Sequence, residues 1–229
     1  PASDYQLNSD GLTLVKWTNS STTTLDMQAD SKLQRVNTIG FEAFKGSNLT
    51  SIVFPNSLKE IGESAFAGTK LTGGVKFNTA SNVVFGKKAF YFSDIVSVQL
   101  PYTTEISRSM FSNCYHLKEV TFGKVGVISN GAFHSCHALT QVDLRGSGVR
   151  QIGEAAFASC TALTKVFLPA SVEKIDDLVF GYCRSLQSIT IDALNPPTLT
   201  GDIFFGLSAD QIPNIYVPAV SVSDYKKAA

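Results

Sequence analysis

Apolar residues recur along this chain at intervals of 21 to 24 residues. The recurring unit reads Ile-Gly-x-x-Ala-Phe with small variations, and it occurs seven times. Every copy ends in a phenylalanine: Phe44, Phe66, Phe90, Phe111, Phe133, Phe157 and Phe180. Self-similarity at a period of this length is typical of a solenoid, in which each repeat forms one coil and stacks on the next.

Each unit continues with a short segment in which apolar and polar residues alternate. These segments centre on Ile52, Val75, Val98, Val120, Val142, Val166 and Ile189. Period-two alternation predicts a strand, and Pro55, Pro101 and Pro169 follow three of the segments where a strand would end. The Gly-x-x-Ala-Phe part has small and aromatic residues at helical spacing over one to two turns, which predicts a brief helical or 3₁₀ segment. We therefore expect an α/β solenoid of about seven coils, each a short helix or turn plus a short parallel strand.

The two ends of the chain lack the unit. Residues 1–35 place Leu12, Leu14 and Trp17 behind an Asp10-Gly11 pair, which favours a hairpin. Residues 193–229 are interrupted by prolines. Because an uncapped solenoid would expose its terminal side chains and strand edges, we expect an N-terminal cap over 1–35, seven repeats over 36–192 and a C-terminal cap over 193–229.

The best-formed copy runs from Ile152 to Pro169 and reads Ile-Gly-x-x-Ala-Phe-x-x-Cys-x-x-Leu-x-x-Val-x-Leu-Pro. This pattern resembles the BspA-like, or Treponema pallidum-type, leucine-rich repeats over about residues 36–192. The tail, with Ile215 to Pro218 followed by Tyr225-Lys226, is similar to the closing segment of that family. Repeats three and seven depart from the pattern, with Phe85 in place of isoleucine and Asp176 in place of glycine.

The resemblance implies a location and a class of partner. Such repeats are typical of secreted or cell-surface proteins of bacteria and of some parasitic protists, where adhesion to host components is the usual suggestion. It therefore implies an extracellular or cell-surface protein whose leader has been removed, since the chain begins at Pro1. The implied partner is a host or microbial surface protein or glycan.

Composition narrows the classes of partner. A 44% hydrophobic content is enough for a packed core and excludes global disorder. The 19 basic and 19 acidic residues cancel, so the chain lacks the field that attracts nucleic acid or an anionic membrane. No apolar run approaches the ~18 residues of a membrane span. We expect neither nucleic-acid binding nor a membrane-spanning segment.

Four cysteines occupy one equivalent position, three residues after the phenylalanine of their repeat: Cys114, Cys136, Cys160 and Cys183. Serine and threonine fill that position in earlier repeats, and exchange with small residues favours buried free thiols. Neighbouring coils ~4.8 Å apart would also permit disulfides. His116, His134 and His137 lie near two of the cysteines and raise a zinc or Cys-His nucleophile hypothesis, but without paired metal-ligand spacing the solvated interpretation is favoured.

No nucleophile elbow, phosphate loop or dinucleotide fingerprint is present, and the acidic residues are scattered. We therefore predict no enzyme, catalytic residue, metal or cofactor. An active site assembled across coils is the alternative.

Alternation within the strands predicts which side chains point outward. The candidate binding residues on this open sheet face are Lys76, Gln99, Thr121, Asp143, Lys165 and Phe167, with Phe167 as a possible hot spot. A merely solvated face is the alternative, and a second candidate group comprises Tyr91, Phe92, Tyr115 and Tyr182. The sequence thus predicts a non-enzymatic, secreted or cell-surface module that binds protein or glycan. The alternative is a structural spacer or assembly domain of a larger cell-envelope protein.

Overall fold

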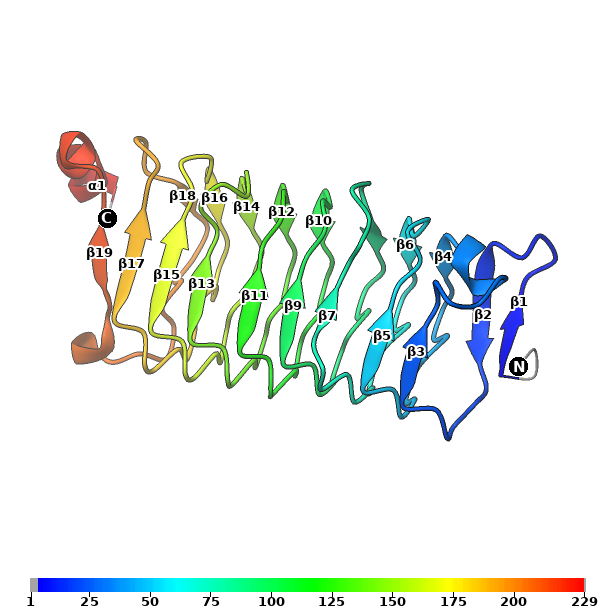
Figure 1. Ribbon diagram of the computed structural model, residues 1–229. Coiled ribbons are helices and arrows are strands. Elements are labelled where there is room, and N and C mark those ends of the chain that lie inside the picture. Colours follow the sequence, from blue (N-terminus) through cyan, green and yellow to red (C-terminus); the bar gives the residue numbers. More distant parts are fainter. Residues whose placement is uncertain (1–3, 229) are drawn as a thin grey trace.

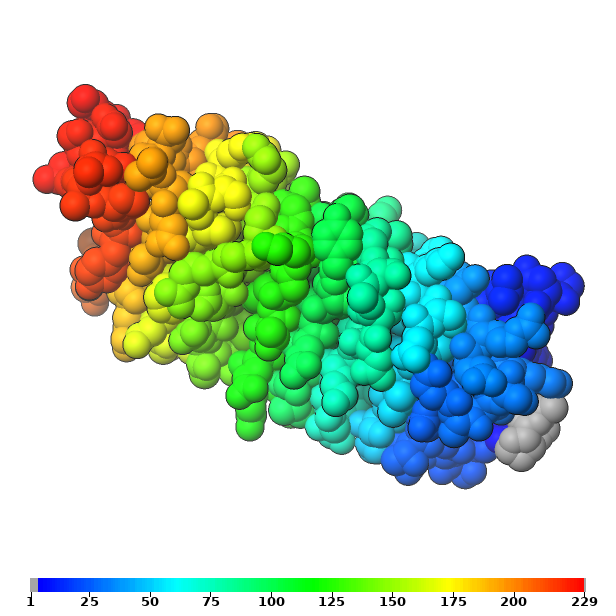
Figure 2. Space-filling model, turned by 45° about the horizontal axis from the view of Figure 1, so that its top comes forward, coloured from blue at the N-terminus to red at the C-terminus, as the bar shows by residue number. Residues whose placement is uncertain are grey.

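The computed structural model describes residues 4–228, which form one elongated solenoid with the two termini at opposite ends (Figure 1). The space-filling view shows the same rod, with the chain progressing steadily from one end to the other (Figure 2). Each coil contributes two short strands and a turn segment. The strands of successive coils stack in parallel, so two rows of strands run along the rod.

The first row contains the seven alternating segments that the sequence predicts as strands and one further strand at each end. Its members are β3 (Thr24–Asp26), β5 (Ser51–Val53), β7 (Val75–Lys76), β9 (Ser97–Gln99), β11 (Glu119–Thr121), β13 (Gln141–Asp143), β15 (Lys165–Leu168), β17 (Ser188–Ile191) and β19 (Asn214–Tyr216). The register places equivalent residues side by side, as with Val98 and Val120. We call the outward side of this row the open face.

A second row of strands was not predicted from the sequence. It consists of β2 (Thr13–Trp17), β4 (Thr38–Ile39), β6 (Glu60–Ile61), β8 (Val84–Phe85), β10 (Glu105–Ile106), β12 (Val127–Ile128), β14 (Gln151–Ile152), β16 (Lys174–Ile175) and β18 (Thr198–Leu199). The first residue of each repeat unit, isoleucine in six copies and Phe85 in the third, belongs to these strands, and its side chain is buried in the core. At the N-terminal end, β1 (Tyr5–Leu7) pairs with β2 as an antiparallel hairpin.

The segments expected to be short helices are turns instead. In the first copy, the Phe44 and Gly46 N–H groups donate to Ala65 and Ala67 of the next coil, both at 2.8 Å. Glu42 and Gly46 have φ angles of 50° and 67°, and two such left-handed residues recur in the other copies. An α-helix needs its N–H groups for internal bonds and right-handed φ angles. These segments therefore form a third hydrogen-bonded stack, which we call the turn edge (residues 41–47 in the first copy and their equivalents).

Helices are confined to other parts of the described chain. Three are single 3₁₀ turns, at Leu33–Arg35, Ala209–Gln211 and Ala219–Ser221, and the α-helix α1 covers Val222–Ala228. None of the helices within residues 4–228 has the length and apolar character that a bilayer span requires.

The core is filled by the phenylalanines of the repeat unit, which stack ring on ring along the rod. Centroids of successive rings from Phe44 to Phe180 lie 4.8–6.0 Å apart, with interplanar angles of 4–13°. The stack continues to Trp17 at one end and to Phe204 at the other. Offset stacking is a favourable arrangement for aromatic rings, so this Phe ladder ties each coil to its neighbours.

Both strand rows also extend beyond the seven recognised units. Strands β2 and β3 lie within residues 1–35, and β18 and β19 lie within residues 193–229. The boundaries proposed at 35 and 192 therefore mark where the sequence unit stops, while the stacked strands continue on both sides.

Candidate functional site

The six candidate binding residues lie on five successive strands of the first row, β7 to β15. Strand pairing places Lys76 beside Gln99, and Gln99 beside Thr121. It also places Asp143 beside Phe167 and Gln141 beside Lys165. The side chains are exposed or half-buried, and together they follow the open face along the rod. Whether this surface binds a partner stays a prediction.

Phe167 is not the bare aromatic that the sequence indicates. The Arg145 guanidinium lies 4.1 Å from the centroid of the Phe167 ring. The same guanidinium donates to both carboxylate oxygens of Asp143, through Nε at 2.9 Å and Nη2 at 2.5 Å. These hydrogen bonds hold the pKa of Asp143 below its usual value, although partial burial opposes the shift. Aromatic ring, cation and carboxylate thus form one fixed cluster on the open face.

Arg145 itself was missed in the sequence analysis. It lies two residues after Asp143, beyond the end of β13, so the strand alternation does not cover it. The spacing Asp-x-Arg at the end of a strand is the signal that could have suggested the ion pair.

The second candidate group divides into two parts. Phe92 packs edge-on against Tyr115 at 5.7 Å, and Tyr115 stacks on His137 at 4.9 Å. Tyr91 lies beside Phe92 at 6.3 Å, with its hydroxyl accepting a hydrogen bond from Asn113. These side chains form an aromatic cluster on the turn edge, in which Phe92 is 54% exposed. Tyr182 lies farther along the rod, packed against Phe205 instead.

The four cysteines are buried free thiols, which confirms the favoured prediction. Each Sγ donates to the carbonyl of the preceding coil's phenylalanine at 3.1–3.2 Å, as from Cys136 to Phe111. Burial raises the pKa of all four thiols, to about 12 for Cys114 and Cys183. A thiol with a raised pKa is a poor nucleophile and a poor metal ligand, so the cysteines act in packing.

The three histidines do not pair with these thiols. His116 lies 3.9 Å from Asp94, and His137 stacks on Tyr115. Burial lowers the pKa of His134, and the neighbouring His137 adds to the shift. Within residues 4–228, no group of three or more His, Cys, Asp or Glu side chains is placed to hold a metal ion.

The two departures from the repeat pattern have structural reasons. Phe85 is buried and packs edge-on against Phe77 at 5.5 Å, where other copies place an isoleucine. Asp176 accepts hydrogen bonds from Gln151 and Thr200 of the neighbouring coils and pairs with Lys174 at 2.6 Å. Burial alone would raise the pKa of Asp176, but these partners together lower it. Both substitutions therefore add contacts to the repeat.

Comparisons with known proteins agree with this architecture. A family model described as the BspA type leucine rich repeat region, in six copies, matches residues 18–139 and 83–209. The crystal structure of the T. pallidum leucine rich repeat protein is 24% identical, covers 100% of this chain and 95% of that chain, and gives a TM-score of 0.57. A leucine-rich repeat protein from Bacteroides ovatus is 28% identical over 80% of this chain, with a TM-score of 0.53.

This chain covers 49% of the B. ovatus protein, so it spans about half of that relative's length. No curated protein matches the chain. The family-model matches extend over most of the sequence, including all seven copies of the unit. The chain belongs to the BspA-type leucine-rich repeat family.

Proposed function

We propose that this chain is a non-enzymatic, secreted or cell-surface module whose open face binds a protein or glycan of a host or microbial surface. Its repeat family supports a protein-binding or structural role. The observation that carries the proposal is the regular open face, on which one outward side chain per coil follows the rod from Lys76 to Phe167.

The face is well suited to recognition because it is already ordered. Its residues are fixed by parallel strand pairing and by the Phe ladder beneath, so little conformational entropy is lost when a partner binds. Side chains of both charges occur on it, with Lys76 and Lys165 in addition to the Asp143–Arg145 pair. Aromatic and arginine residues dominate binding energy at many interfaces. The Phe167–Arg145–Asp143 cluster is therefore the proposed centre of the site.

The test is direct binding of the purified chain to an array of extracellular-matrix proteins and surface glycans. The variant carries Lys76→Ala and Phe167→Ala. A matched control carries Glu60→Ala and Val84→Ala, which remove two exposed side chains from the second strand row. We expect saturable binding that weakens at least tenfold in the open-face variant and is unchanged in the control.

Two results would contradict this assignment. Binding that survives in the open-face variant but is lost with Phe92→Ala and Tyr115→Ala would move the site to the aromatic cluster on the turn edge. No saturable binding to any array component would favour a spacer or assembly domain.

One observation favours that second candidate function. Strand β19 ends the first row, and all three of its residues are exposed. An unpaired strand edge can pair with another chain, which would join rods end to end in a larger cell-envelope protein. Sedimentation velocity over a range of concentrations, with Tyr216→Lys as the edge variant, distinguishes an assembling domain from a monomeric binding module.

A further inference from the structure

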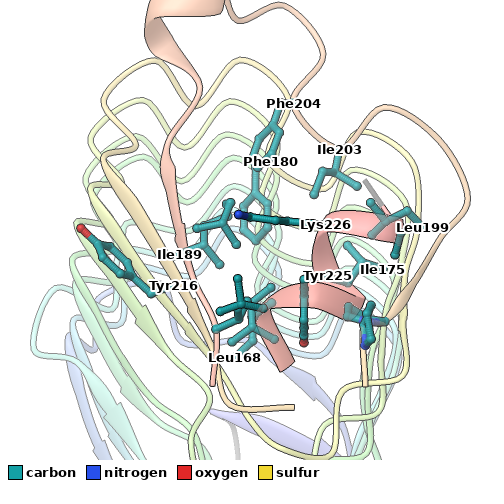
Figure 3. Close-up of a pocket in the computed structure, with 17 residues that line it drawn as sticks. Leu168, Ile175, Phe180, Ile189, Leu199, Ile203, Phe204, Tyr216, Tyr225 and Lys226 are labelled. Atoms are coloured by element: carbon teal, nitrogen blue, oxygen red, sulfur yellow. The ribbon is translucent and has the colours of Figure 1, made fainter. Parts of the chain in front are cut away.

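The C-terminal end of the rod contains a hollow of about 540 Å³ (Figure 3). Its inner wall is the end of the core, with Leu168, Phe180 and Ile189 almost completely buried. Its rim includes Leu199 and Tyr216, which are 47% and 56% exposed. The hollow is therefore deep and open to solvent at one side, and its volume lies within the range of small-molecule pockets.

The walls of this hollow come from elements that are distant in sequence. The last strands of the two rows, β18 and β19, supply opposite sides. The helix α1 lies across the opening and is fixed there by Tyr225, whose hydroxyl donates to the Ala193 carbonyl at 2.9 Å. This bond uses the tyrosine hydroxyl, so the space itself is lined almost entirely by carbon.

Among the described residues, Lys226 is the charged one in the lining, and no aspartate or glutamate lines the hollow with it. Figure 3 shows its side chain drawn over the hollow, and the residue is exposed. The adjacent Lys227 pairs with Asp224 at 3.7 Å, whereas Lys226 forms no ion pair with any described carboxylate. A single unpaired cation over an apolar hollow selects for a ligand that is apolar with one negative charge.

We propose that this end pocket binds a free fatty acid, with the alkyl chain in the hollow and the carboxylate at Lys226. An apolar hollow accepts apolar ligands, because the water that they displace finds few hydrogen-bond partners there. An ammonium–carboxylate bond at the rim is charge-assisted and strong where carbon surrounds it. None of the six candidate binding residues from Lys76 to Phe167 lines this pocket, so the inference goes beyond the proposed binding function.

Isothermal titration calorimetry with monomeric alkanoates tests the proposal. Affinity should rise about fourfold for each added CH₂ from octanoate to dodecanoate, since each methylene is buried. Dodecyltrimethylammonium has the same chain with the opposite charge, and we expect it to bind at least tenfold more weakly than dodecanoate.

Two exposed lysines on the same helix provide matched variants. Lys226→Met should weaken dodecanoate binding about tenfold, while Lys227→Met should leave it unchanged. Leu199→Glu places a carboxylate on the exposed rim and should abolish dodecanoate binding. Lys226, Lys227 and Leu199 are all solvent-exposed, so circular dichroism of the variants should match that of the parent chain.

The proposal is overturned by any of four results. These are no dodecanoate binding, equal affinity for the anionic and cationic amphiphiles, equal losses in the two lysine variants, or binding to anionic lipid vesicles without binding to monomeric dodecanoate. A concentration-dependent dimer that dodecanoate does not dissociate would assign the hollow to a second copy of this chain and would also overturn it.

Discussion

Removing one ring from the middle of the Phe ladder should destabilise the whole rod. Phe157 is fully buried and stacks between Phe133 at 5.1 Å and Phe180 at 6.0 Å. Its backbone N–H donates to the Val179 carbonyl, and an alanine keeps that bond. Phe157→Ala therefore removes side-chain packing while it leaves the hydrogen bonds between coils in place.

The expected loss has two components. The variant loses the hydrophobic stabilisation of the buried ring, which is about 3 kcal/mol more than that of an alanine side chain at roughly 25 cal/mol per Å². If neighbouring coils close only part of the space, a residual cavity of roughly 80 Å³ adds about 2 kcal/mol at ~24 cal/mol per Å³. Stability should therefore fall by about 3–5 kcal/mol, the usual range for a buried phenylalanine replaced by alanine.

Equilibrium urea denaturation, followed by circular dichroism, measures this loss. Phe41→Ala is the matched control, because Phe41 is 66% exposed and its truncation should change stability by less than about 0.5 kcal/mol. The slope of the transition should be the same in all three proteins if they unfold as one unit. A loss below about 1 kcal/mol for Phe157→Ala would refute the argument that stacked rings hold the coils together.

Three further predictions concern other contacts. A disulfide-exchange reagent at pH 8 should label no cysteine in the folded chain and four after denaturation, because the thiols are buried with raised pKa values. The pKa of Asp176 is lowered in the folded state, so its contribution to stability is complete above the unfolded pKa and is lost as pH falls through the folded pKa. Denaturation between pH 6 and pH 2 should show that loss, and Asp176→Asn should reduce it. Both side chains of the Arg150–Glu173 ion pair are exposed, and salt screens exposed charges. Arg150→Ala should therefore leave the midpoint of urea denaturation unchanged at high salt.

The sequence predicted the first strand row and the core anchors because their signals are local and repeated. Alternation over three residues, copied seven times, identifies β5 to β17, and the recurrence of phenylalanine every 21 to 24 residues identifies the Phe ladder. Phe204 was missed because its unit reads Leu-Thr-Gly-Asp-Ile-Phe, from Leu199 onward, without the Ile-Gly signature. The stack nevertheless uses it as a further ring.

The second row and the turn edge could not be predicted in the same way. A two-residue strand such as β6 is too short to show any period. Left-handed positions usually reveal themselves as glycine, yet Glu42, Ser64 and Lys88 adopt φ angles of 50–57°. Hydrogen bonds from these residues or their neighbours to the next coil stabilise that backbone, and contacts between coils leave no trace in the sequence of one unit.

The candidate sites also differ in how far the local sequence could predict them. The open face follows from strand alternation, so its residues could be named in advance. The Arg145 contact with Phe167 depends on how the loop after β13 lies against β15 of the next coil. The end pocket has no local signal at all, because it is formed where the stack stops and α1 crosses it.

The two strand rows divide every coil into two arcs of different character. One arc crosses the turn edge and joins the inward residue of a second-row strand to the inward residue of the next first-row strand, as from Ile39 to Ile52. In each of the seven coils between Ile39 and Ile189, this arc is 13 or 14 residues long. The return arc takes 8 to 10 residues, so more of the variation in repeat length falls there. Foreign peptides should therefore be tolerated at exposed positions of the return arcs, such as Ala80 and Ser81, while a single residue inserted within the turn edge would shift its hydrogen bonds to the next coil.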